Sequence, residues 1–180
     1  MQHQEVILDF KEQRAGRFLI PAFRLHAGEI VVIKIPGGPF FRETVQRFVK
    51  TLVPGAGFAF IDSLPQRRFL PSTVQQFVRK NAGPRSALIT ELYAIPEINE
   101  NSILQHLSSC DQKIVSLYTH LSSTNKILFD FAGISPYKEN LVFTTIQRHV
   151  QPDGGALLFD HCDEFRDQCN SFIEAILPAG

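Results

Sequence analysis

The stretch Gly28-Glu29-Ile30-Val31-Val32-Ile33-Lys34-Ile35-Pro36-Gly37-Gly38-Pro39-Phe40-Phe41-Arg42-Glu43-Thr44 decides the fold. Its apolar run 30–35, interrupted only by Lys34, predicts a strand that is buried on both faces. The Pro-Gly-Gly-Pro segment predicts a tight turn. Beyond the turn, apolar residues at i, i+3, i+4 and i+7 predict a helix with one buried face, made by Val45, Phe48, Val49 and Leu52. The segment 54–57 is expected to end this helix.

A strand, a glycine-containing turn and a helix also make up the P-loop that binds ATP. Such a loop reads G-x-x-x-x-G-K-[ST], because Gly lets backbone N–H groups approach the phosphates, Lys neutralises them and the hydroxyl holds Mg²⁺. When the stretch is aligned with this pattern without gaps from Gly28-Glu29, Ile35 and Phe40 take the two Gly positions. Phe41 takes the Lys position and Arg42 the Ser/Thr position. The sequence therefore predicts a degenerate P-loop made of Pro36, Gly37, Gly38, Phe40, Phe41 and Arg42.

Two side chains around this turn argue further against a bound phosphate. Glu43 falls in the first turn of the helix, where it would repel the anion that a helix N-terminus otherwise attracts. Two consecutive Phe at a loop-to-helix junction require burial of at least one ring, worth about 1.5–3 kcal/mol each. We therefore expect Phe40 and Phe41 to fill the phosphate space or to pack into the core beside it.

Strands and helices alternate along the rest of the chain. We expect strands at 6–10, 18–25, 58–62, 126–131 and 156–160. We expect helices after a Thr73 cap, within 103–121, at 137–150 with Leu141, Val142, Thr145 and Ile146 inward, and at 164–177, while 81–101 is mixed. This alternation predicts an α/β sheet with parallel members.

Composition narrows the class of protein. The 180 residues predict one domain over 1–180, and 44% hydrophobic and 20% charged residues are ordinary for a globular protein. The net charge of +0 gives no support for nucleic-acid binding. No apolar run reaches the roughly 20 residues of a membrane span, and the first residues do not resemble a secretory signal. We expect a cytoplasmic protein that binds no nucleic acid and does not insert into a membrane.

Several short stretches occur in the order and rough spacing of one set of motifs. They are Gly28-Glu29 before the first central strand, Leu64-Pro65-Gln66, Leu107-Ser108-Ser109-Cys110-Asp111, Ile127-Leu128-Phe129-Asp130, and His161 after a late strand. In this order the chain resembles the nucleotide-binding domain of ABC transporters. The resemblance implies that Gln66 takes the place of the Q-loop glutamine, 107–110 that of the signature, Asp130 that of the Walker B aspartate and His161 that of the switch histidine.

The resemblance also implies a fold, and it implies that several residues the family uses for catalysis are missing. The fold would be a P-loop NTPase-like (ABC ATPase-like) parallel sheet core with an N-terminal β-hairpin and a reduced helical subdomain at roughly 68–122. Phe131 stands where the family has its catalytic Glu, and Ser109 and Cys110 replace the two signature glycines. Asp130, His161 and Gln66 are then vestigial, and neither ATP nor Mg²⁺ is expected as a cofactor.

These losses favour a pseudo-ATPase that acts as a structural or partner-binding subunit, with a membrane transporter subunit or a homo- or hetero-dimer mate as partner. It would lie at the membrane only through that partner, whose short helix would dock on an exposed apolar patch between Gln66 and Leu121. The alternatives are a divergent ABC ATPase that still binds or hydrolyses ATP with a partner chain, and an unrelated α/β binding protein.

Two other kinds of chemistry have weaker sequence support. His161, Cys162 and Cys169 are too few and too widely spaced for tetrahedral zinc, so no metal is expected. Cys110 with His106 or His120 could form a nucleophilic pair, and a helix over 103–121 would bring His106 and Cys110 to one face at i, i+4.

Overall fold

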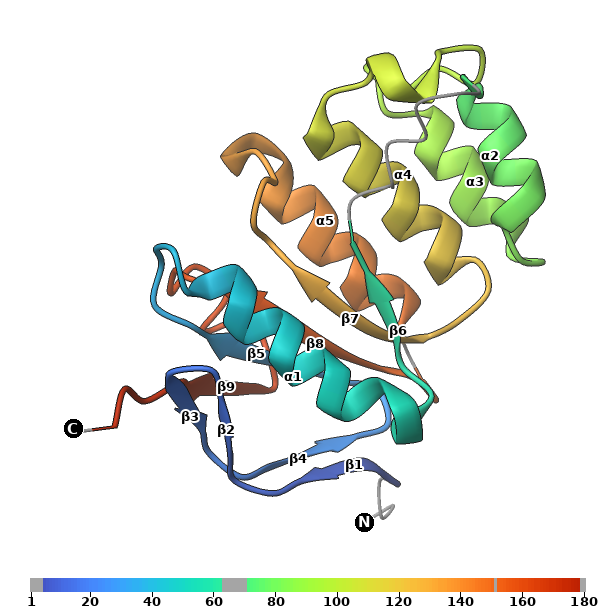
Figure 1. The fold of residues 1–180 in the computed structure, drawn as a ribbon. Coiled ribbons are helices and arrows are strands. Elements are labelled where there is room, and N and C mark those ends of the chain that lie inside the picture. The colour runs from blue at the N-terminus through green and yellow to red at the C-terminus, as the bar shows by residue number, and fades with distance from the viewer. Residues whose placement is uncertain (1–4, 63–70, 151, 179–180) are drawn as a thin grey trace. The chain divides into compact units, whose positions relative to one another are not determined.

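The computed structural model describes residues 5–62, 71–150 and 152–178 (Figure 1). Its strands are β1 Val6–Phe10, β2 Gln13–Ala15, β3 Phe18–Ile20, β4 Phe23–His26, β5 Glu29–Lys34, β6 Ala59–Ile61, β7 Lys126–Asp130, β8 Gly155–Asp160 and β9 Ser171–Glu174. Its helices are α1 Phe41–Ala56, α2 Val74–Asn81, α3 Ser86–Tyr93, α4 Ser109–Leu121, α5 Pro136–His149 and the short 3-10 helix η1 Leu104–His106.

The centre of the fold is a five-stranded sheet in the order β6-β7-β8-β5-β9. Strand β5 pairs in parallel with β8 on one side and with β9 on the other, and Ile33 faces Phe159 and Ile173 across the two ladders. Residues 30–33 of β5 are at most 3% exposed. The prediction of a central strand buried on both faces is therefore confirmed.

Helix α1 covers this sheet with the predicted apolar stripe. Val45, Phe48, Val49 and Leu52 are all buried, and they share one hydrophobic core with β5, β7, β8 and the N-terminal strands. Figure 1 shows α1 lying across these strands. The helix ends within the predicted segment 54–57: it continues to Ala56 and stops at Gly57, whose φ of 70° suits the left-handed conformation that glycine adopts without strain.

The N-terminal strands are antiparallel, as predicted, but their number was wrong. The expected strand over 18–25 is two strands, because Pro21 and Ala22 separate β3 from β4. Strand β3 forms a hairpin with β2 around Gly16, and β4 pairs with β1. Proline has no backbone N–H to donate to a ladder, which explains the break.

The expected closing helix over 164–177 is wrong. Residues 164–168 form turns, and Ser171–Glu174 form β9 along the outer edge of β5. The backbone N–H of Asn170 donates to Ile30, and that of Ala175 donates to Lys34, so the ladder is closed at both ends. An unpaired edge of β5 would leave buried peptide groups unsatisfied, and the tail satisfies them by becoming a strand.

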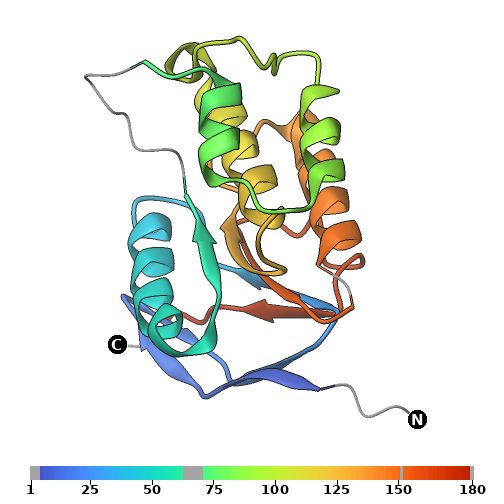
Figure 2. The same ribbon diagram turned by 90° about the vertical axis from the view of Figure 1, so that its right-hand side faces the viewer.

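By packing, the chain divides into two compact units. One comprises 1–60, 126–132 and 150–180, and contains most of the sheet with α1. The other comprises 61–125 and 133–149, and contains α2, α3, α4 and α5 as a helical bundle (Figure 2). Within the described residues, no helix is long and apolar enough to cross a membrane.

Helix α4 is the centre of the helical unit, where it packs against α2, α3 and α5. Thr73 caps α2 with the reciprocal hydrogen bonds of a capping box, as its sequence predicts. On α5 the inward positions Val142, Thr145 and Ile146 are confirmed, and the Thr145 hydroxyl lies 3.0 Å from that of Tyr118. Leu141 was expected inward but is 36% exposed.

Candidate functional site

The candidate site lies at the carboxyl edge of the parallel strands, within the sheet-containing unit. Three chain segments leave the sheet here: 35–40 after β5, Phe131 after β7 and 161–163 after β8. In open α/β sheets this edge is where ligands bind. The sequence-predicted residues of the degenerate P-loop, Asp130 and His161 are all brought to it.

The loop between β5 and α1 keeps the outline of a phosphate-binding turn. Pro36, Gly37, Gly38 and Pro39 are exposed, and Gly38 has a φ of 120°, which only glycine adopts readily. The backbone N–H of Phe41 donates to the Gly38 carbonyl at 3.2 Å, so this donor turns back onto the loop. The loop scaffold is present, and its first helical N–H is already used.

The two Phe of this loop are held by the protein. Phe41 is 7% exposed and belongs to the core, with its ring edge-on to His161 at 6.2 Å. Phe40 is half-buried against the same core, and the Arg17 guanidinium lies 3.9 Å above its ring. The expectation that at least one ring is buried is confirmed. Phe41, which the sequence alignment places opposite the P-loop Lys, is therefore a core residue.

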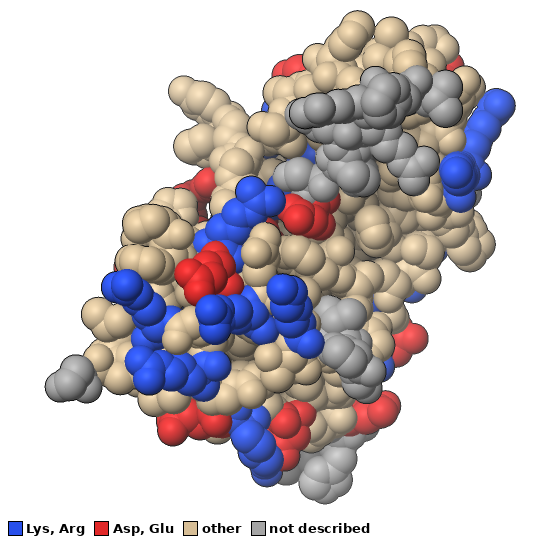
Figure 3. Space-filling view, viewed as in Figure 1, with Lys and Arg blue, Asp and Glu red and all other residues tan. Residues whose placement is uncertain are grey.

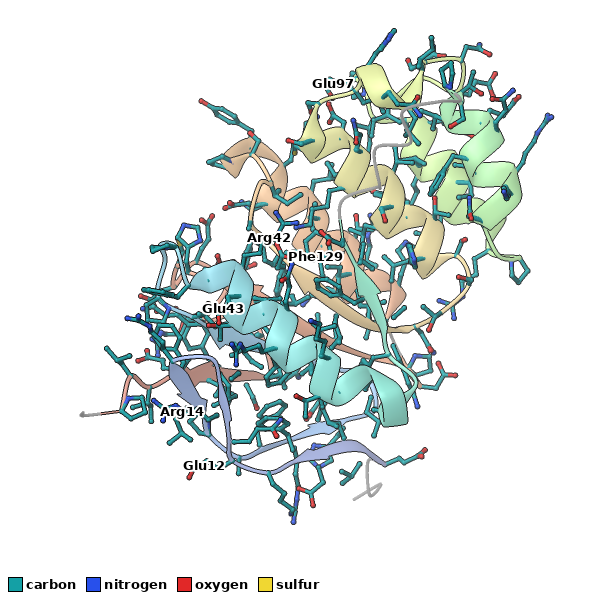
Figure 4. All side chains as sticks on the ribbon, viewed as in Figure 1. Glu12, Arg14, Arg42, Glu43, Glu97 and Phe129 are labelled. Carbon is teal, nitrogen blue, oxygen red and sulfur yellow. The ribbon has the colours of Figure 1, made fainter. Side chains whose placement is uncertain are left out.

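The first turn of α1 carries exposed charges of both signs. Arg42 and Glu43 lie at its start (Figure 4), and Glu43 pairs with Arg47 at 2.9 Å. Lys and Arg side chains gather over α1 and the β2–β3 hairpin, with acidic side chains among them (Figure 3). The exposed basic residues of these elements are Arg14, Arg17, Arg42, Arg47 and Lys50; we call them the basic face.

The end of β7 has an acidic residue followed by an aromatic one. Asp130 is 9% exposed. Phe131 is 2% exposed, and its ring packs against Phe129 and Phe165 with centroids 5.4 Å and 4.8 Å away. The Phe131 ring is thus part of an aromatic cluster inside the protein.

The end of β8 carries charged groups that were not singled out from the sequence. Asp160, at the last position of the strand, is 4% exposed, and its carboxylate accepts the backbone N–H of His161 at 2.7 Å. Burial raises the pKa of the Asp160 carboxyl above its ordinary value, although the backbone donors of His161 and Cys162 oppose this. Next to it, Lys34 pairs with Asp163 at 2.7 Å. In the sequence, Asp160 and Lys34 could each have been recognised as a charged residue that ends an otherwise apolar strand.

The signature-like segment 107–110 lies in the helical unit, at the start of α4. The Ser108 hydroxyl accepts the N–H of Asp111 and donates to the Asp111 carboxylate, so the helix N-terminus is capped from within. The Cys110 thiol accepts the N–H of Ser135 at 3.4 Å. Leu107 ends the preceding turn, and Ser109 is exposed. The start of α4 therefore already carries a carboxylate, that of Asp111.

Neither proposed Cys–His pair is brought together. His106 belongs to η1, and the extended backbone at Leu107 and Ser108 separates it from Cys110, so the i, i+4 relation of one continuous helix does not apply. His120 is ten residues from Cys110 on α4, about 15 Å along the axis, and its ring contacts the Ser116 carbonyl at 2.8 Å. Gln66, the predicted Q-loop residue, lies outside the described residues.

The apolar patch predicted between Gln66 and Leu121 is tested only in part, because residues 63–70 lie outside the described residues. Between 71 and 121, the described residues include no exposed large hydrophobic side chain. Such side chains occur instead on α5, where Tyr137 is 96% and Leu141 36% exposed, and at Val6, Ile176 and Leu177. The chain around α4 buries its apolar residues within the helical unit itself.

Lys138 forms ion pairs with Asp111, at the start of α4, and with Glu97, and substitution of Lys138 tests how much these pairs stabilise the protein. Its ammonium pairs with Asp111 at 2.7 Å and with Glu97 at 3.1 Å. Burial opposes its charge, but the two hydrogen bonds outweigh this and raise the pKa of Lys138 above its ordinary value. Lys138→Met should lower the free energy of unfolding at pH 7 by about 1–3 kcal/mol, the cost of an unpaired buried polar group.

Because the pKa of Lys138 is higher in the folded than in the unfolded state, the charged lysine stabilises the fold fully at pH values below its unfolded-state pKa. This stabilisation is lost as the pH rises through the folded-state pKa. Urea unfolding should therefore show the difference between wild type and Lys138→Met shrinking as pH rises above about 10.4, the unperturbed lysine value. Lys80→Met, on an exposed position of α2, is the matched control and should be near neutral. Equal effects of the two variants would contradict the assigned pairing.

With this geometry described, known proteins can be compared. No family model matches the sequence, and no curated protein matches it. Solved structures do match. The chain has the fold of an ABC-type ATPase domain. A protein assigned as the ATP-binding protein of an ABC transporter from Pyrococcus furiosus matches with a TM-score of 0.67 at 13% identity, over 92% of this chain and 94% of that one.

Two further structures agree on the ABC-type fold. The ATP-binding subunit of an ABC transporter matches with a TM-score of 0.64 at 18% identity, over 85% of this chain and 77% of that one. CbiO1 from Clostridium perfringens, part of the ABC transporter complex CbiONQ, matches with 0.59 at 12% identity, over 97% and 88%. The predicted fold class is therefore confirmed, with a parallel sheet and antiparallel N-terminal strands.

Proposed function

We propose that this ABC-type domain is a pseudo-ATPase that does not bind ATP and acts as a structural or partner-binding subunit of a larger complex. The observation that carries the proposal is the burial of Phe41, at the place of the P-loop Lys. An apolar ring fixed in the core neither neutralises phosphate charge nor leaves room for a lysine to replace it.

Three other observations support the loss of catalysis. Phe131 is packed among aromatic rings, so no carboxylate can polarise water at that position. The hydroxyl of Thr44, two residues after the position of the P-loop Ser/Thr, donates to the Phe40 carbonyl at 2.8 Å and is buried, which keeps it from holding Mg²⁺. At the signature-like segment, Asp111 occupies the start of α4.

We expect the purified chain to show no saturable binding of ATP–Mg²⁺. Calorimetry and thermal unfolding with millimolar ATP would measure it, with an ATP-binding ABC domain as positive control. A ligand at 100 times its Kd stabilises the folded state by about 2.7 kcal/mol, so tight binding would raise the melting temperature visibly. A clear saturable shift would overturn the pseudo-ATPase assignment.

The basic face favours the second candidate, a divergent ATPase that binds nucleotide with a partner chain. Its arginines lie on α1 and the neighbouring hairpin, and a phosphate could pair with Arg42. Such binding would be exposed and strongly screened by salt. ATP binding that falls steeply with NaCl and is lost in Arg42→Ala, but not in Arg24→Ala on β4, would support this candidate.

The remaining alternative was an unrelated α/β binding protein whose motif matches are coincidental. The match to ABC-type domains over nearly the whole chain argues against a different architecture. The two candidates that share the fold are separated by the ATP measurement.

The partner-binding role is tested through α5. Tyr137 and Leu141 are four residues apart, and therefore on one face of the helix, and both are exposed. Tyr137→Asp and Leu141→Asp should each reduce co-purification of a membrane transporter subunit from native cells, with circular dichroism unchanged. Asn140→Ala, on an exposed position between them, is the control. Equal recovery of the subunit by all variants would exclude this face of α5 as the contact.

A further inference from the structure

Three consecutive side chains at the end of β8 offer three different metal-ligand atoms. Asp160 contributes a carboxylate oxygen, His161 an imidazole nitrogen and Cys162 a sulfur, and these atoms all lie within 4.8 Å of one another. The sequence pointed instead to Cys169 as the partner of His161 and Cys162. In the structure the Cys169 thiol donates to the Arg166 carbonyl at 3.5 Å, and burial raises its pKa. The structure thus replaces a distant cysteine by an adjacent carboxylate.

The strand fixes one end of this cluster and the loop leaves the other end adjustable. Asp160 is in ladder register with Lys34, and its carbonyl accepts the N–H of Ile35 at 2.8 Å, so its position is set by the sheet. His161 has half of its side chain exposed, and its ring lies against the backbone of Gly37 and the edge of Phe41. Cys162 is exposed.

The donor set selects the kind of ion. Thiolate, imidazole and carboxylate together suit a borderline-soft divalent ion such as Zn²⁺, with metal–ligand distances of about 2.0–2.3 Å. In a tetrahedral site these lengths place ligand atoms about 3.3–3.8 Å apart. The exposed thiol and the half-exposed imidazole need to move by only about an ångström to reach that spacing.

The basic side chains near the cluster are already paired with carboxylates, so the charges around it are compatible with a bound cation. The neighbouring basic side chains Lys34 and Arg166 are paired with Asp163, and Arg166 also with Glu174. The Nδ1 atom of His161 lies 3.3 Å from a carboxylate oxygen of Asp160. A cation bound here would contact the carboxylate of a residue that is only 4% exposed, where opposite charges attract more strongly than in water.

We propose that Asp160, His161 and Cys162 form a three-ligand Zn²⁺ site at the carboxyl edge of the sheet, with a fourth position open to water. Structural zinc sites have four protein ligands, whereas three protein ligands leave a fourth position for water or another small ligand. None of the three ligands comes from the segment 36–42, although the His161 ring lies next to Gly37 and Phe41.

The test uses the full chain, stripped with chelator and kept reduced. Zn²⁺ is titrated in competition with a chromophoric chelator, and Co²⁺ is titrated separately by absorption. We expect one ion per chain and a thiolate-to-Co²⁺ charge-transfer band. Cys162→Ser should abolish the band, and Cys162→Ser and His161→Gln should each weaken Zn²⁺ binding at least about tenfold, the lower limit seen even for outer-sphere partners.

The matched controls are the remaining thiols and an exposed histidine. Cys169→Ser, Cys110→Ser and His106→Gln should leave both the affinity and the Co²⁺ band unchanged. Absence of stoichiometric binding in the wild type would overturn the site, and so would unchanged binding in the double variant of Cys162 and His161. Because Cys162 is exposed, its substitution should leave folding intact, which circular dichroism verifies.

Discussion

Phe131→Glu, which places a Glu where the resemblance expects the family's catalytic residue, should destabilise the protein by about 3–5 kcal/mol and yield no ATPase activity. The loss of a buried aromatic ring alone costs about that much. The introduced carboxylate would also stand between Phe129 and Phe165, where the wild-type side chain is 2% exposed. A charge without a partner in such a place is disfavoured further.

The pH dependence of this variant is part of the prediction. An apolar surrounding raises the pKa of an introduced carboxyl, so the folded variant binds a proton more readily than the unfolded chain. Its deficit in stability should therefore grow as pH rises from about 4 through the raised pKa. Urea unfolding at several pH values measures this.

Phe131→Leu is the control and should cost no more than about 1.5 kcal/mol, because it keeps the site apolar. If Phe131→Glu were as stable as Phe131→Leu at a pH of about 7.5, well above the ordinary carboxyl range, the aromatic cluster would not be closed to water. The position could then have held a working carboxylate.

The elements that the sequence predicts well are those whose burial pattern repeats over many residues. Strand β5 is apolar on both faces and α1 has a complete i, i+3, i+4, i+7 stripe, so their local patterns and their packing agree. The tail was misassigned because 164–177 is too mixed for periodicity to decide. Its strand state depends on an open edge of β5, and Asn170 contacts Ile30 there across a sequence separation of 140 residues.

The site shows the same division between local and non-local information. The turn of the degenerate P-loop is a local motif, and its glycines and prolines predicted it. The proximity of Phe41 to His161 and the pair Lys34–Asp163 arise only when β5 and β8 become neighbours. The sequence marks Asp160 as a charged residue that ends an apolar strand, but its burial depends on packing that the local sequence does not reveal.

Gly83 is a second position whose importance only the structure reveals, and Gly83→Ala should destabilise the helical unit by about 2–5 kcal/mol. A Cβ at this position would come within 2.5 Å of the Ser122 carbonyl oxygen and 2.6 Å of the Ser123 Cα. Both are backbone atoms at the end of α4, so neither can rotate away. Overpacking of this kind costs about 1–3 kcal/mol.

A hydrogen bond at Gly83 adds to that cost. The backbone N–H of Gly83 donates to the Ser122 hydroxyl at 2.8 Å, and this fully buried hydroxyl in turn donates to the Thr119 carbonyl at 2.6 Å. Moving the segment to admit a methyl group lengthens the first bond, and loss of a buried bond costs about 1–3 kcal/mol more.

Gly57→Ala is the informative control, because its φ of 70° disfavours alanine while, apart from its neighbours along the chain, no atom of the described residues lies within 4 Å of the new Cβ. It should cost only the left-handed strain of about 1–2 kcal/mol. Urea unfolding of both variants compares crowding with strain directly. A smaller loss in Gly83→Ala than in Gly57→Ala would mean that the chain around 82–85 yields easily, and that the contact with the end of α4 does not hold the helical unit together.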